Sequence, residues 1–300
     1  MKKVFRVFLS IFIFWGIKFL FCLIRIFPIK FVYWFAENLS GLYYIVSKRN
    51  RNLALRNLQI VLGNQSNLHI LKKIIRQSCS TMGIAVIDTI RYHNLPAKKV
   101  KTLIKIQGLE NLEQAFKNGK GVIIVSAHLG SFTILGCRLI VEGYPVNFVM
   151  RPMRYKRMEK IAISLSSKIG QNIIFTRPSH SFIRGCLDAL AKNELLFLAI
   201  DQNFGKLGVP VKFFSSQAKC PAGPFTLSKH SGASVVPMFM INKPNHAHLL
   251  CIEPALELDF NARHRGRNLQ PIADVLEKYV RKYPGQWESW THKPWQTGTK

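Results

Sequence analysis

Short, wholly apolar runs bounded by turn residues recur along this chain and predict buried strands. The runs at residues 122–125 and 195–200 contain no polar side chain, which is typical of parallel strands covered on both faces. Further strands are expected at residues 100–106, 146–150, 172–175, 234–241 and 248–252. Helical spacing of apolar residues predicts helices at 68–92, 132–141, 155–169, 182–192, 224–230 and 271–282. This alternation predicts an α/β fold with a mixed, mostly parallel sheet of about six or seven strands flanked by helices.

The first 35 residues follow a different pattern. Residues 7–24 are apolar apart from Ser10 and Lys18, and basic residues precede and follow the run. A spanning helix needs about 20 apolar residues, and the run nearly reaches that length; Lys18 can also snorkel from a helix lying in the interface. No small-residue cleavage site marks a removable signal. We expect an N-terminal membrane-anchoring helix in residues 1–35, spanning or, preferably, in-plane, followed by one domain at 36–300.

The next stretch continues as a helix over residues 36–60. Within it, Leu55 and Leu58 are separated by basic and amide side chains, which predicts an amphipathic helix with a cationic face. A solvated basic surface explains the same spacing equally well. Asp88 lies inside the predicted helix at 68–92 and is interpreted as a structural residue.

Composition adds charge to this picture. The chain has 43 Lys and Arg against 15 Asp and Glu, a net charge of +28, which implies an anionic partner. Aromatic residues interleave with the basic ones near the N-terminus, and no nucleic-acid-binding motif is present, so an anionic membrane is favoured over nucleic acid. The six cysteines are scattered, without Cys-x-x-Cys or metal-ligand spacing. They are interpreted as free thiols of a reducing compartment.

A titratable side chain follows the apolar strand at residues 122–125. Ser126 and Ala127 lead directly to His128, and Gly130 comes two residues later. In open α/β sheets, ligands bind at the carboxyl ends of the strands, and the glycine allows a close approach. A capping or core histidine is the alternative interpretation, but similar polar residues follow other strands.

Three further strands end in residues suited to binding or catalysis. Asp201 and Gln202 follow the apolar strand at 195–200, and Arg151 follows 146–150. Arg177 comes two residues after the strand at 172–175. An arginine at a strand end is a planar donor suited to a phosphate or carboxylate, although each of these arginines can also be a surface charge. The active edge is therefore expected where these residues and His128 converge.

The motif His128-Leu129-Gly130-Ser131-Phe132-Thr133 resembles the bacterial lysophospholipid acyltransferase superfamily, and within it the late acyltransferases of lipid A biosynthesis. That family has a strand ending in His, Phe or Leu, Gly, a small polar residue, an aromatic residue and then Glu or Asp. The Arg-Pro pair at 151–152, the Asp-Gln pair at 201–202 and the closing stretch 283–295 are also similar to the family. The resemblance covers about residues 40–296. The chain departs from it at Thr133, where the family has its carboxylate.

The resemblance implies a glycerolipid acyltransferase-like fold and assigns roles to these residues. His128 is the expected general base for acyl transfer, and a carboxylate on its other nitrogen fixes the tautomer and stabilises the imidazolium. Thr133 can accept a hydrogen bond from the ring but carries no charge, and losing the acid costs about 10⁴ in turnover in a serine protease. We therefore expect Asp201 to replace it. Substrate binding is expected from the residues Gly130, Arg151, Arg177 and Gln202.

The same resemblance implies a function and partners. The expected reaction moves a fatty acyl chain from an acyl carrier protein or acyl-CoA thioester to a hydroxyl of a lipid A precursor or related glycolipid or phospholipid. No metal or organic cofactor is implied. The expected location is the bacterial inner membrane, with the active domain on the cytoplasmic side. Two alternatives remain: an impaired homologue that binds acyl lipid or carrier without turnover, and a basic membrane-surface binding protein.

Overall fold

A large sheet and a separate small hairpin contain all strands of the described chain. A computed structural model describes residues 2–62, 67–202, 208–214, 216–260 and 265–291. The strands are β1 (Ile104–Gln107), β2 (Val122–Ser126), β3 (Val146–Met150), β4 (Asn172–Phe175), β5 (Leu195–Ala199), β6 (Val209–Phe213), β7 (Ser216–Cys220), β8 (Ser234–Asn242) and β9 (His248–Ile252). The seven-stranded sheet has the order β1-β9-β8-β2-β5-β3-β4, and β6 pairs with β7 alone.

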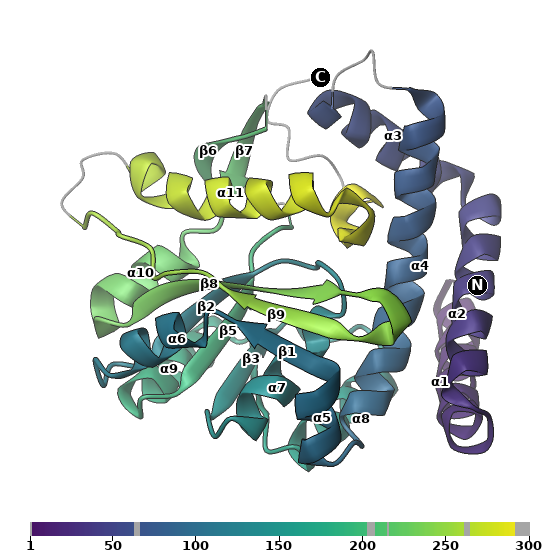
Figure 1. Cartoon of the computed structure of the whole chain (residues 1–300), viewed down its shortest axis with the longest axis horizontal. Helices are drawn as coiled ribbons and strands as arrows, with labels where there is room; N and C mark the ends of the chain where they lie inside the picture. Colours follow the sequence, from purple (N-terminus) through teal and green to yellow (C-terminus); the bar gives the residue numbers. More distant parts are fainter. Residues whose placement is uncertain (1, 63–66, 203–207, 215, 261–264, 292–300) are drawn as a thin grey trace.

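Helices cover the large sheet, and the helices of the N-terminal part of the chain extend beyond it (Figure 1). They are α1 (Lys2–Ile26), α2 (Ile29–Val46), α3 (Lys48–Leu62), α4 (Leu68–Tyr92), α5 (Ala97–Leu103), α6 (Leu109–Phe116), α7 (Leu135–Val141), α8 (Lys156–Lys168), α9 (Ser179–Ala191), α10 (Gly223–Ser231) and α11 (Arg265–Lys282). Short 3-10 helices lie at Phe132–Ile134, Pro244–His246, Pro284–Gln286 and Glu288–Thr291.

The apolar runs form the centre of the sheet, as their composition predicts. All five residues of β2 are buried. Val122 and Ile124 pack into one hydrophobic core, and Ile123 and Val125 pack into the other, because successive strand residues point to opposite faces. β2 runs parallel to β5 and β8, while β8 and β9 are antiparallel. The prediction of a mixed, mostly parallel α/β sheet is confirmed.

Several predicted elements are corrected by the structure. Residues 100–106 were expected to form a strand, but α5 ends at Leu103 and only Ile104–Gln107 is β1. Val100 and Leu103 are three residues apart, which fits one helical turn as well as an extended run. The single helix expected over 36–60 is two helices, because the backbone leaves the helical conformation at Ser47. The strands β6 and β7 were not predicted, and they pair with each other outside the large sheet.

The N-terminal helices pack against α4. Val32, Tyr33 and Ala36 of α2 form a small core with Leu23 of α1 and Ile87 of α4. The opposite side exposes large apolar side chains, namely Trp15, Phe19, Ile26, Phe27, Phe31, Trp34, Leu39, Leu42, Tyr43, Ile45 and Val46. Among the described residues, no helix combines the length and the apolar character that crossing a bilayer requires. The boundary predicted at residue 35 falls inside α2 and stays a prediction.

One edge of the sheet gathers the ends of four parallel strands. β2 pairs with β5, β5 with β3, and β3 with β4, all in parallel. Their carboxyl ends therefore lie at the same edge, where the residues that follow each strand can meet.

Candidate active site

His128 and Asp201 form a hydrogen-bonded pair at the carboxyl ends of β2 and β5. The His128 Nδ1 atom lies 2.6 Å from Asp201 Oδ1. The carboxylate is fully buried, whereas the histidine side chain keeps 20% of its surface exposed. The ring is therefore held on its Nδ1 side and open on its Nε2 side. This is the arrangement expected of a general base with an orienting carboxylate.

Two residues near the end of the chain complete the surroundings of Asp201. Its Oδ2 atom accepts hydrogen bonds from Trp287 Nε1 at 2.8 Å and from Ser289 Oγ at 2.7 Å. The backbone N–H of His128 donates to the same oxygen at 3.0 Å. Both residues belong to the stretch 283–295 that resembles the family, but the resemblance implied no contact for them; residues 292–295 lie outside the described residues. Nothing local in the sequence indicates these donors.

Burial and hydrogen bonding act against each other on this pair. Burial lowers the pKa of His128, but the charge of Asp201 and its hydrogen bond raise it by more, so the pKa lies above the ordinary value. Burial raises the pKa of Asp201, and the charge and hydrogen bond of His128, with the donors Ser289 and Trp287, lower it by more. Asp201 is therefore an anion that favours the imidazolium form. Glu288, nearby, has a raised pKa because it is buried.

The loop that follows β2 is fixed at every backbone N–H from His128 to Ser131. Leu129 N–H donates to the Ala127 carbonyl at 2.8 Å, and Gly130 N–H donates to the Gln286 carbonyl at 2.9 Å. Ser131 N–H donates to Asn242 Oδ1 at 2.9 Å. Together with the bond from His128 N–H to Asp201 described above, these contacts leave no backbone donor in the loop free.

Gly130 sits where only a glycine fits. Its φ angle is +57°, and a Cβ atom there would lie 2.3 Å from the Met240 carbonyl oxygen. This backbone conformation is readily adopted by glycine and strained for other residues. The predicted substrate-binding glycine thus shapes the loop, and its N–H is already engaged by Gln286.

The open side of His128 faces an amide and an aromatic ring. Gln202 Nε2 lies 3.4 Å from His128 Nε2. The Phe132 ring contacts the imidazole edge-on, with ring centroids 4.6 Å apart. Arg151 is exposed, and its charge opposes the rise in the pKa of His128. A reacting hydroxyl at Nε2 would thus lie beside the Gln202 amide.

Arg177 follows β4 at the same edge of the sheet. The Thr176 N–H donates to the Met150 carbonyl at 3.0 Å, so the segments bearing Arg151 and Arg177 leave the sheet side by side. Both arginines are exposed. The charge of Arg151 acts on His128, whereas Arg177 follows β4, which lies three strands away from β2 in the sheet.

Thr133 has another partner. Its Oγ1 lies 2.6 Å from Thr89 Oγ1 in α4, while the Nδ1 atom of His128 is bonded to Asp201. The structure thus places a carboxylate on the ring, and that carboxylate comes from the end of β5 instead of the motif position. No group of three His, Cys, Asp or Glu side chains suited to a metal ion lies within the described part of the chain.

An apolar cavity lies beside the donors of Asp201. Trp287 and Ser289 form part of its wall, and the rest comes from α3, the β6–β7 hairpin and Trp290. Its apolar lining includes Ile60, Val61, Phe213, Phe214 and Ala218. The cavity volume is about 50 Å³, and about 440 Å³ is reached only when the open solvent at its mouth is included. The apolar lining therefore suits a short stretch of hydrocarbon, and the cavity is smaller than a typical ligand pocket of about 300–1,000 Å³.

The chain is similar to known acyltransferases. Residues 2–297 match the family model described as bacterial lipid A biosynthesis acyltransferase. The chain is 26% identical over 253 residues to the lipid A biosynthesis palmitoleoyltransferase of Escherichia coli, which covers 83% of this chain and 80% of that protein. It is 22% identical to the lipid A biosynthesis lauroyltransferase of the same organism, over 90% and 87% of the two chains. It is 20% identical to a phosphatidylinositol mannoside acyltransferase of Mycolicibacterium smegmatis, over 77% and 75%.

Proposed function

Because the chain belongs to the bacterial lipid A biosynthesis acyltransferase family and is an acyltransferase, we propose that it transfers a fatty acyl chain from a thioester to a lipid hydroxyl. The donor is an acyl carrier protein or acyl-CoA thioester, and the acceptor is a lipid A precursor or a related glycolipid or phospholipid. The observation that carries this proposal is the 2.6 Å contact between His128 Nδ1 and Asp201 Oδ1, on a ring that keeps 20% of its side-chain surface exposed and whose Nε2 lies 3.4 Å from the Gln202 amide.

In the proposed reaction, His128 is the general base. Its Nε2 takes the proton of the acceptor hydroxyl while the hydroxyl oxygen attacks the thioester carbon. The resulting tetrahedral intermediate collapses as the carbon–sulfur bond breaks, and the imidazolium returns its proton to the leaving thiolate. Asp201 keeps the Nδ1 proton in place and stabilises the imidazolium. The fully buried position of Asp201 supports this role, because its charge is little screened by water.

The developing oxyanion needs donors that the His128 loop does not supply. The backbone N–H groups of residues 128–131 are all engaged within the protein. The side-chain amide of Gln202 lies next to His128 Nε2, so it is the proposed donor to the oxyanion. Arg151 and Arg177 are the proposed contacts for an acceptor phosphate, because a guanidinium group can donate two parallel hydrogen bonds to phosphate oxygens.

We place the acyl chain in the apolar cavity bounded by Trp287, Phe213 and Ala218. A methylene group gains about 0.8 kcal/mol when it leaves water, so each methylene group that enters this cavity would add to the donor's affinity. Trp287 and Ser289 belong both to the cavity wall and to the donors of Asp201. The chain-binding and catalytic parts of the proposed site therefore share side chains.

The membrane is the proposed location of the reaction. Exposed Trp15, Phe19 and Trp34 lie on α1 and α2 with the basic residues Lys18 and Lys30, a combination typical of helices that lie in an anionic interface. We propose that these helices hold the enzyme on the inner membrane with the catalytic domain on the cytoplasmic side. The net charge of +28 would also attract an acidic acyl carrier protein.

Acyl transfer in membranes tests this function. Radiolabelled acyl carrier protein is offered with a lipid A precursor and, separately, with lysophospholipids, to wild type, His128→Ala and the exposed control His230→Ala. We expect transfer by the wild type and the control, and at least about a 10³-fold loss in His128→Ala. A wild type that binds acyl carrier or lipid without transferring the chain would instead support the binding-protein alternative. Transfer that survives in His128→Ala would contradict the base assignment.

A further inference from the structure

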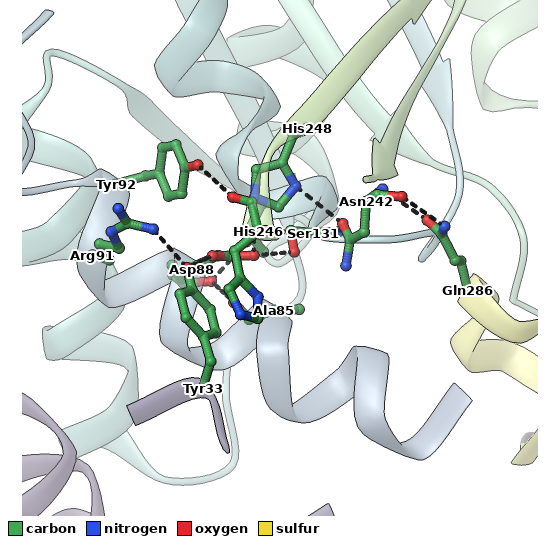
Figure 2. Close-up of polar contacts among 12 residues, drawn as sticks. Tyr33, Ala85, Asp88, Arg91, Tyr92, Ser131, Asn242, His246, His248 and Gln286 are labelled. Carbon is green, nitrogen blue, oxygen red and sulfur yellow. Dashed lines mark hydrogen bonds and ion pairs between the residues drawn. The ribbon is translucent and has the colours of Figure 1, made fainter. Parts of the chain in front are cut away.

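A second buried carboxylate, Asp88, lies close to the catalytic loop and has no role in the proposed reaction. Asp88 belongs to α4 and is fully buried. It accepts hydrogen bonds from Ser131 Oγ and from the Tyr33 hydroxyl. Figure 2 shows Tyr33 of α2 and Ser131 of the loop after β2 beside Asp88. One carboxylate therefore joins segments that are far apart in the sequence.

Ser131 is the point at which this cluster reaches the catalytic loop. It comes three residues after His128, and its side chain is completely buried. Its hydroxyl binds Asp88, and its backbone N–H binds Asn242 Oδ1 at 2.9 Å. Only Leu129 and Gly130 lie between His128 and Ser131, so an anchor at Ser131 limits the conformations of the loop that carries the imidazole.

Asn242, at the end of β8, ties the same point to the closing segment of the chain. Its backbone N–H donates to Gln286 Oε1 at 2.8 Å, and its carbonyl accepts from Gln286 Nε2 at 3.0 Å. The imidazole of His248 lies between the two anchors of Ser131, with Nδ1 at 3.2 Å from Asn242 Oδ1 and Nε2 at 3.4 Å from Asp88 Oδ2. The network is thus continuous from Asp88 to Gln286 (Figure 2).

Tyr33 connects the cluster to the N-terminal helices. Burial, and then the charge of Asp88, raise the pKa of Tyr33 well above its ordinary value, so the hydroxyl keeps the proton that it donates. Its ring stacks on His246 with centroids 3.6 Å apart, and Arg91 donates to its oxygen at 2.9 Å. The next residue of α2, Trp34, is exposed and belongs to the group of exposed apolar side chains on α1 and α2.

We propose that Asp88 is a positioning residue for acyl transfer. It holds the His128 loop through Ser131 and ties that loop to α2 through Tyr33, so that the helix with the exposed apolar face and the general base share one buried support. This inference rests on the proposed function, because it concerns the placement of the same general base. A carboxylate with a purely structural role would stabilise the fold without changing turnover by the folded enzyme.

Three variants with two matched controls separate these roles. Asp88→Asn, Ser131→Ala and Tyr33→Phe each remove one part of the network. Ser228→Ala removes another buried serine hydroxyl, bonded to a carbonyl in the region of α10, and Tyr279→Phe removes another buried tyrosine–carboxylate bond. The kcat and KM for acyl carrier protein, the pH profile and the unfolding midpoint are measured for all five.

We expect Ser131→Ala and Asp88→Asn to lower kcat about tenfold to 100-fold, with KM within about twofold of wild type. The acid limb of the pH profile should stay in place, because the His128–Asp201 contact is intact. A sixth protein that combines Asp88→Asn with Ser131→Ala should lose less than the product of the two single losses, since both substitutions remove the same bond. Tyr33→Phe should lower kcat, whereas Tyr279→Phe should leave it within about twofold. Equal losses in the control variants, or unchanged kcat in Ser131→Ala, would overturn the proposal.

Hydrogen exchange at the amides of Gly130 and Ser131 gives a readout that does not depend on activity. Faster exchange is expected in Asp88→Asn and Ser131→Ala, but not in Ser228→Ala, because the loop loses its support. Unchanged exchange would overturn the positioning role even if the enzyme is active. Transfer that is independent of His128, with faster exchange in these variants, would instead show that the proposed function has failed while the loop support stands.

Discussion

Replacing Asp201 by asparagine tests the catalytic pair most directly, because the surroundings of the carboxylate determine how the amide would lie. Oδ2 accepts three hydrogen bonds, from His128 N–H, Trp287 and Ser289, whereas Oδ1 accepts one from His128 Nδ1. The side-chain oxygen of the asparagine should occupy the position of Oδ2, where three donors point at it. The NH₂ group then faces Nδ1 and donates to it, so the ring proton moves to Nε2 and the base is in the wrong tautomer.

The magnitude follows from this geometry. The wrong tautomer, together with a missing counter-charge, cost about 10⁴ in turnover in a serine protease. We expect Asp201→Asn to lower kcat about 10³- to 10⁴-fold, which corresponds to about 4–5.5 kcal/mol of activation free energy. The three donors remain satisfied, so the fold should be kept. Asp188→Asn is the matched control, because that carboxylate is exposed and lies 3.8 Å from Arg184 on α9.

The pH profile gives an independent check with a definite sign. A base works when it is neutral, and the pKa of His128 is raised, so wild-type kcat/KM should rise with pH through a midpoint above 6.5. Without the charge of Asp201, burial remains and lowers the pKa, so the acid limb of the variant should move to lower pH. A kcat within tenfold of wild type, with an unmoved acid limb, would refute the role of Asp201.

The same two shifts predict how stability depends on pH. Folding lowers the pKa of Asp201, so the contribution of this carboxylate to the unfolding free energy is present above about pH 3.8. It is lost as the pH falls through the pKa that Asp201 has in the folded protein. Folding raises the pKa of His128, so the contribution of the imidazolium to the unfolding free energy is complete below about pH 6.5. It is lost as the pH rises through the pKa that His128 has in the folded protein. The difference in unfolding free energy between wild type and Asp201→Asn should therefore be largest between those two values. A difference that does not vary with pH would contradict the coupling.

Three further substitutions have definite expected outcomes. Gly130→Ala should lower the unfolding midpoint and abolish transfer, because its Cβ would lie 2.3 Å from a strand carbonyl at positive φ; Gly143→Ala, at φ +95° with nothing within 4 Å, should keep transfer. Thr133→Glu should not raise kcat in the transfer assay, since Thr133 contacts Thr89 and Nδ1 is already occupied; a tenfold gain would contradict this. Ala218→Leu narrows the cavity and should shift kcat/KM toward shorter acyl donors by about tenfold; an unchanged chain-length preference would exclude this cavity as the acyl site.

The sheet was predictable from sequence because its strands carry strong local signals. The fully apolar run at 122–125 and the run ending before Asp201 lie in the centre of the sheet, where both faces are buried. The ends of parallel strands share an edge, so the meeting of His128 and Asp201 followed from two local observations and one topological rule. The strand predicted at residues 100–106 was partly wrong, because a short apolar run fits a helical turn and a strand alike.

The supports of the site were not predictable in the same way. Ser289 reaches Asp201 across 88 positions and Ser131 reaches Asp88 across 43, and no periodicity or spacing encodes such contacts. Asp88 was interpreted as structural because it lies inside an apolar helical pattern. Only the packing of α4 against the loop after β2 shows which side chain it serves. Thr133 likewise gives no local sign that its partner is Thr89.

The short segment after α11 has a consequence for the order in which the protein is made. A chain synthesised as far as residue 283 already holds His128, Asp201 and every strand of the large sheet. It lacks the donors Trp287 and Ser289, so Asp201 would be left with part of its hydrogen bonds, and a buried anion with fewer donors is unfavourable. Domains fold from the N-terminus during synthesis, which lets the apolar helices α1 and α2 reach a bilayer first. If the enzyme acts at a membrane as proposed, the surroundings of Asp201 would therefore be completed after the N-terminal helices have been made.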